Sequence, residues 1–127
     1  MSDARVPLLI AAALAALLAA AHSYLGERYI LIRLFRRDEL PKLFGGVEFT
    51  KHTLRFAWHL TSVAWLGLAA LVAVLASSPS GAGRTQARLI SVIFALSGVV
   101  ALVRSRGRHL SWIVFFGIAA LVWLGYP

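Results

Sequence analysis

Four long apolar runs decide what this chain can fold into. Each is roughly 17 to 24 residues long, enough for a helix to cross a hydrocarbon core of about 30 Å. None alternates polar and apolar residues with a period of two, which argues against a transmembrane β-barrel. The sequence therefore predicts an all-α, polytopic membrane protein. We expect one four-helix transmembrane bundle over residues 1–127, with helices at about 6–24, 53–76, 87–103 and 110–126.

The composition also favours a chain embedded in lipid. Hydrophobic residues make up 60% of the 127 residues and charged residues only 14%, and the mean hydropathy is +0.79. A small soluble domain leaves much of its surface exposed and could not hide so much apolar area. The chain contains no cysteine, which excludes disulfides, thiolate catalysis and iron–sulfur clusters.

Lys and Arg are distributed unevenly between the loops. Seven lie between the first two runs or at the start of the second, and three lie between the third and fourth. The opposite side has only Arg5, Arg84 and Arg88. Because basic loops of membrane proteins face the cytoplasm, we expect both basic loops there and both chain termini outside, in an inner membrane. The positive charge is then expected to meet anionic headgroups rather than nucleic acid.

The first run also has features of a secretory signal peptide, with a small-residue cleavage site after Ala21. Cleavage would place the most basic loop outside the cell, against the positive-inside rule. We therefore expect a retained transmembrane helix.

The segments between the first three runs differ in character. A Ser/Pro/Gly-rich turn joins the second run to the third. Between the first and second, the apolar residues from Ile30 to Phe35 fall on one helical face with arginines around the rest. This pattern is typical of an amphipathic helix on the membrane surface, ended by Pro41 and the pair Gly45–Gly46. Alternatively, the first helix simply continues and its arginines reach back to the headgroups.

All four histidines fall on the side of the basic loops. His22 ends the first run, His52 and His59 begin the second, and His109 begins the fourth. The spacing of His52, Arg55 and His59 places them on one helical face. His22 should lie at a similar depth to His59 on an antiparallel neighbour. Ionisable groups in hydrocarbon are costly, so they are rarely there without a partner or a task.

Several roles fit these histidines. Two of them on different helices could hold a haem iron, with His22, His59 and His52 as the candidates for cofactor binding. His22, Glu27 and His59 could instead bind a divalent metal ion. His52 and His59 could hardly share one ion, because about 10 Å of helix separates them. The simpler alternative is that each histidine only joins neighbouring helices or faces the interface.

The charged residues beside the histidines also have two interpretations each. Glu27 could form an ion pair with Arg28 at headgroup level, or accept a hydrogen bond from His22 or His59 and fix its tautomer. Arg55 and Arg28 are predicted to contact lipid phosphate or another anion.

Two short stretches, "HSYLGE" and "RFAWHL", resemble a group of small, uncharacterised bacterial four-helix membrane proteins. Members share H-S-x-x-G-E at the end of the first helix and W-H at the start of the second. The match falls on His22, Ser23, Gly26, Glu27, Trp58 and His59. The resemblance implies a four-helix layout and gives weight to these six positions, but it implies no activity.

These observations lead to three expectations about function. The first is a non-enzymatic membrane protein whose cluster on the cytoplasmic side binds a ligand, a metal ion or haem, alone or within a larger assembly. The second is a purely structural or oligomerising accessory subunit. The third is a small transporter, which is disfavoured because all five acidic residues lie in loops or near helix ends. The sequence contains no HExxH, Walker or GxSxG motif that would indicate an enzyme.

Overall fold

The computed structural model describes residues 5–77 and 83–126. The Ser/Pro/Gly-rich turn predicted after the second apolar run falls mostly on residues 78–82, outside the described residues. The described residues form α-helices and one π-helical segment: α1 (Arg5–Leu25), η1 (the π-helix Gly26–Leu31), α2 (Ile32–Leu34), α3 (Val47–Ser77), α4 (Arg84–Ser105) and α5 (Ser111–Gly125).

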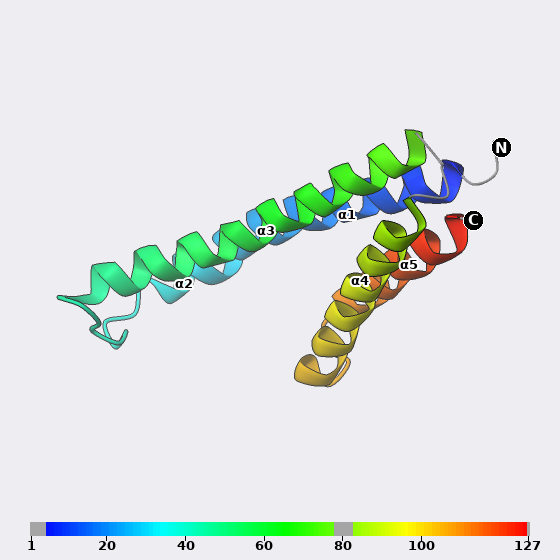
Figure 1. The fold of residues 1–127 in the computed structure, drawn as a ribbon. Coiled ribbons are helices and arrows are strands. Elements are labelled where there is room, and N and C mark those ends of the chain that lie inside the picture. The colour runs from blue at the N-terminus through cyan, green and yellow to red at the C-terminus, as the bar shows by residue number, and fades with distance from the viewer. Residues whose placement is uncertain (1–4, 78–82, 127) are drawn as a thin grey trace.

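The helices form two antiparallel hairpins (Figure 1). In the first, α1 and its continuation through η1 and α2 run along α3. In the second, α4 pairs with α5. Contacts between α1 and α5 join the hairpins, whereas α3 and α4 meet only sparsely. The start of α1 and the end of α5 lie together at one end of the molecule. At the opposite end, the first hairpin extends well past the second (Figure 1).

The predicted all-α fold is confirmed over the described residues. Three helical stretches are long and apolar enough to cross a membrane: Arg5–Leu34, Val47–Ser77 and Arg84–Ser105. The fourth, α5, has 15 residues, fewer than the roughly 17 to 25 that a spanning helix needs. A fourth membrane span therefore stays a prediction.

The largest differences from the sequence-based expectation are at the start of α3 and after α1. The helix expected from residue 53 begins at Val47, because its first turns are stabilised by polar contacts that hydropathy does not register. Lys51 Nζ lies 2.9 Å from Glu48 Oε1, and the buried Thr50 hydroxyl donates to Pro41 O at 2.7 Å. The amphipathic segment is a continuation of the first helix, not a separate surface helix, and it ends at Leu34 rather than at Pro41.

The core lies where both hairpins meet, near the start of α1 and the end of α5. Its largest fully buried side chains are Phe94, Leu8, Ile118, Val72 and Val122. Buried alanines on α1 (Ala11, Ala15 and Ala19) let the neighbouring helices approach closely.

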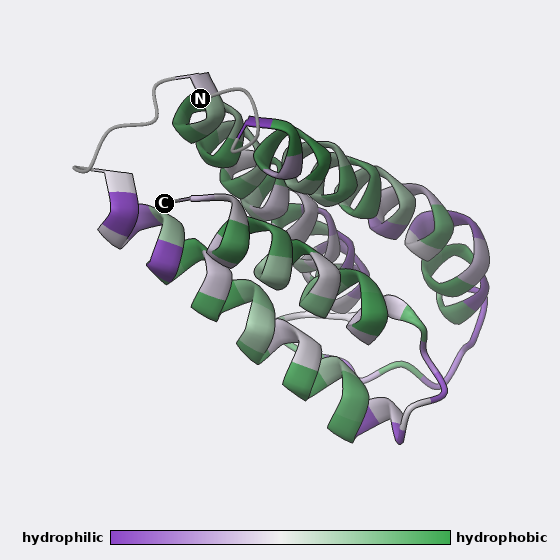
Figure 2. Ribbon diagram, turned by 90° about the vertical axis from the view of Figure 1, so that its right-hand side faces the viewer, coloured by the Kyte–Doolittle hydropathy of each residue, from purple (hydrophilic) through white to green (hydrophobic). Residues whose placement is uncertain are grey.

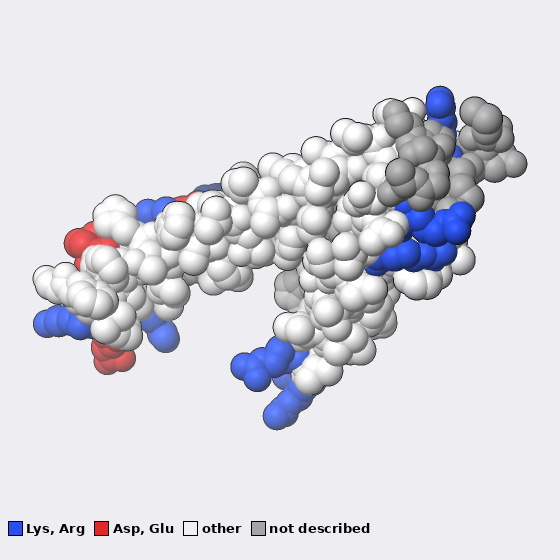
Figure 3. All heavy atoms as spheres, in the orientation of Figure 1, with Lys and Arg blue, Asp and Glu red and all other residues white. Residues whose placement is uncertain are grey.

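The outer surface of the helices is apolar between charged ends. Figure 2 shows hydrophobic residues along the middle of the helices. In Figure 3, Lys and Arg gather at the ends of both hairpins and leave a band without charge between them. Leu66 on α3 and Leu96 on α4 are examples of large apolar side chains that are exposed on the helices. Contiguous apolar surface of this kind is costly in water but is matched by lipid.

Candidate functional site

The six residues that carry the resemblance meet in one place, where α1 passes into η1 beside α3. At the centre of this cluster is Glu27. Its carboxylate forms a two-point ion pair with Arg55, with Nη2 at 2.9 Å from Oε1 and Nε donating to Oε2 at 3.1 Å. The pairing partner of Glu27 is therefore Arg55, twenty-eight residues away, and not the adjacent Arg28, which is exposed.

His59 connects Glu27 to Ser23. Its Nε2 lies 3.2 Å from Glu27 Oε2, and its Nδ1 lies 2.5 Å from Ser23 Oγ. Both ring nitrogens are thus engaged in hydrogen bonds. A metal ion or haem iron could bind His59 only after one of these bonds broke, so the geometry gives His59 the role of joining α3 to the first helix.

His22 is held differently from His59. Its Nδ1 lies 3.0 Å from Ser62 Oγ, and its ring stacks on the Trp58 indole with centroids 4.5 Å apart and planes 4° from parallel. Trp65 contacts the same ring edge-on at 4.8 Å. No hydrogen bond to His22 Nε2 is present among the described residues. The ring is therefore fixed on three sides, and Nε2 remains able to bind a ligand.

Gly26 explains the glycine of the shared pattern. The Trp58 indole lies directly over it, and a Cβ at this position would overlap the indole ring. Trp58 is itself held there, because its Nε1 donates to His22 O at 3.0 Å. Gly26 also begins the π-helical segment η1, and such segments are frequent at functional sites.

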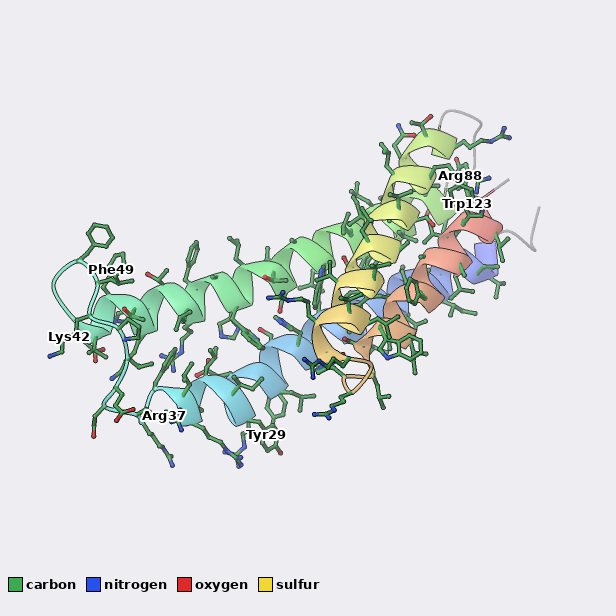
Figure 4. The ribbon with its side chains drawn as sticks, turned by 90° about the horizontal axis from the view of Figure 1, so that it is seen from below. Tyr29, Arg37, Lys42, Phe49, Arg88 and Trp123 are labelled. Carbon is green, nitrogen blue, oxygen red and sulfur yellow. The ribbon has the colours of Figure 1, made fainter. Side chains whose placement is uncertain are left out.

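A pocket of about 400 Å³ opens beside His22, between the two hairpins. Its walls are aliphatic and aromatic, and no Asp, Glu, Lys or Arg is among the described residues that line it. Tyr29, labelled on η1 in Figure 4, lines one side. The second hairpin contributes His109, Ser111 and Phe115.

The structure brings together some of the predicted site residues and separates others. His59, Glu27 and Arg55 form one network, as described above, whereas His22 joins the pocket through its own partners. His52 is exposed and makes no hydrogen bond within the described part of the chain. Across residues 5–77 and 83–126, no group of three or more His, Cys, Asp or Glu side chains could hold a metal ion.

Sequence reasoning missed three contributors to the site. Ser62 could have been suspected, because a serine in an apolar helix often bonds across to a neighbour. Trp58 is expected from the sequence to belong to an aromatic belt at the inner interface, but in the structure it covers Gly26 and stacks on His22. His109 lines the same pocket as His22, and only the packing of the two hairpins reveals this.

No protein-family model matches this chain, and no curated protein or solved structure matches it either.

Proposed function

We propose that this chain is a non-enzymatic membrane protein that binds a small ligand in the pocket beside His22. The observation that carries the proposal is that the His22 ring is fixed in place while its Nε2 is left available. Ser62, Trp58 and Trp65 fix its position, while Nε2 has no hydrogen-bond partner among the described residues and the ring lines the pocket. A side chain fixed in advance loses little further freedom on binding, which favours affinity.

The contacts favour some ligand classes over others. A bare divalent ion has little support, because the described residues offer no group of three donors. Haem, the other class expected from the sequence, needs only an axial imidazole and an apolar cavity, and His22 could supply the imidazole. Because both nitrogens of His59 are engaged, the proposal assigns ligand contact to His22 and helix joining to His59.

The proposal places the protein in a bacterial inner membrane with four spans, the basic loops in the cytoplasm and both termini outside. The unequal distribution of basic residues supports this orientation, since ten of the thirteen Lys and Arg lie toward the loops after the first and third apolar runs. Arg37, Lys42 and Phe49 all lie at the far end of the first hairpin (Figure 4), and Phe44 is 89% exposed. Aromatic and basic residues together suit the anionic headgroup layer, where Arg28 is also expected.

The experiment that tests the proposal is an inventory of what co-purifies with the protein. The wild-type protein would be isolated in mild detergent and analysed by ultraviolet–visible absorption, elemental analysis and mass spectrometry of an organic extract. We expect one bound small molecule, strongly reduced in His22→Phe, which keeps an aromatic ring on Trp58 but removes Nε2 together with the hydrogen bond of Nδ1 to Ser62. The matched control is His52→Phe, at an exposed position, and it should retain the ligand.

A structural role for the chain is the second candidate, and one observation favours it. The hydrogen-bonding groups named above already pair with one another: Glu27 with Arg55 and His59, and His59 with Ser23. This is expected if these residues only hold helices together within a larger assembly or oligomer. A protein that carries no ligand but co-purifies with a partner would support this function. A transporter has less support, because Glu27 is paired with Arg55 rather than available to exchange a proton.

A further inference from the structure

The pocket beside His22 contains a second imidazole, from the other hairpin. His109 precedes α5 and lines the same pocket, and Phe115 of α5 faces Trp65 of α3 with ring centroids 5.3 Å apart. A molecule in this pocket would therefore contact both hairpins, with one imidazole on each side of the interface between them.

Local contacts fix which nitrogen of His109 carries the proton. The Ser111 N–H donates to His109 Nδ1 at 3.3 Å, and Ser111 Oγ lies 2.8 Å from the same nitrogen. The ring thereby accepts one of the backbone N–H groups that the first turn of a helix leaves unpaired. Since Nδ1 is the acceptor, the neutral ring has its proton on Nε2, which is a hydrogen-bond donor.

The rest of the lining selects a neutral aromatic ligand. Tyr29, Trp58, Trp65 and Phe115 supply ring faces and edges, against which a planar ring stacks favourably. The described residues of the lining include no charged side chain, so an anionic or cationic ligand would find no countercharge. The apolar lining residues Leu25 and Ile30 are each 48% exposed, which gives an apolar tail a way out into lipid.

We infer that this pocket is a binding site for a lipophilic quinone. One ring carbonyl accepts a hydrogen bond from His109 Nε2–H, the ring lies among the tryptophans, the second carbonyl faces His22, and the tail leaves past Leu25 and Ile30. This inference rests on the proposed function and names its ligand class. Haem fits less well, because the described residues of the lining offer no cation for its two propionates.

The test is a titration of the full-length protein in lipid nanodiscs with decylubiquinone, followed by quenching of tryptophan fluorescence. We expect saturable quenching. It should require about tenfold more quinone in His109→Asn, the factor associated with loss of one hydrogen bond. The side-chain oxygen of asparagine can accept the backbone N–H two residues on, so this variant can keep the contact with Ser111 and removes only the imidazole. His52→Asn is the matched control and should bind like the wild type.

Two further titrations make every outcome decisive. Decylbenzene has the tail without the carbonyls; if it displaces decylubiquinone at equal concentration, or if His109→Asn binds decylubiquinone like the wild type, the quinone site is overturned. If haemin binds with a Soret band that His22→Phe abolishes and decylubiquinone does not compete, the proposed function stands and the quinone inference fails. If neither probe binds saturably, both fail.

Discussion

At the scale of single residues, each member of the shared pattern has a geometric task. Ser23 and Glu27 take the two nitrogens of His59, and Trp58 lies on His22. Gly26 leaves the space that Trp58 occupies. These residues therefore form one contact between two helices, although the two stretches that contain them lie far apart in the sequence.

Gly26→Ala tests this explanation at the tightest point. The added methyl group would overlap the Trp58 indole, and we expect a loss of about 1–3 kcal/mol in the free energy of unfolding, as in other overpacked sites. The measurement is the unfolding midpoint in detergent. Gly67→Ala is the control, since nothing lies within 4 Å of a Cβ there. Equal midpoints for the two variants would contradict the described packing.

At the scale of elements, the sequence predicted the apolar middle of each helix better than its polar ends. Hydropathy located the helices because lipid requires long apolar runs. It could not show that α3 begins at Val47, because the stabilising contacts there are polar and one of them reaches back to Pro41. Nor could it choose between a surface helix and a continued first helix, since both have the same pattern of apolar residues.

Thr50→Val tests how the start of α3 is held. Valine keeps the shape of the buried Thr50 side chain but cannot donate to Pro41 O, so we expect a local loss of about 1 kcal/mol. That loss should increase the rate of tryptic cleavage in the loop before α3, at Arg37 and Lys42, about fivefold. Thr53→Val, at an exposed position, should leave the cleavage rate unchanged. If both variants are cut at the wild-type rate, the hydrogen bond does not anchor the loop.

At the scale of the whole molecule, the site depends on how the two hairpins pack. The sequence predicted that His22, Glu27 and His59 would lie on one side of the bundle, and the structure connects the last two. The sequence could not reveal the pocket, because its helical pattern does not show which face of α5 meets α1. His109 becomes a lining residue only through that packing.

The predicted orientation can be measured directly, because the chain has no cysteine of its own. Single variants would be labelled with a membrane-impermeant maleimide in spheroplasts. Gln86→Cys and Leu124→Cys should react from outside, whereas Lys42→Cys and Arg108→Cys should react only after the membrane is opened. Labelling of Leu124→Cys tests whether α5 crosses the membrane. The reverse pattern would place the basic loops outside.

The central claim is a division of work between neighbouring histidines: His22 binds the ligand, and His59 holds the helices. The most direct measurement determines ligand content and unfolding midpoint together for His22→Phe and His59→Phe. We predict that His22→Phe loses the co-purified ligand and only about 1 kcal/mol of stability, the amount expected for its single hydrogen bond to Ser62. His59→Phe should keep the ligand but lose about 1–3 kcal/mol of stability, because it breaks the hydrogen bonds to Ser23 and Glu27. Ligand loss in His59→Phe with full retention in His22→Phe would contradict the account.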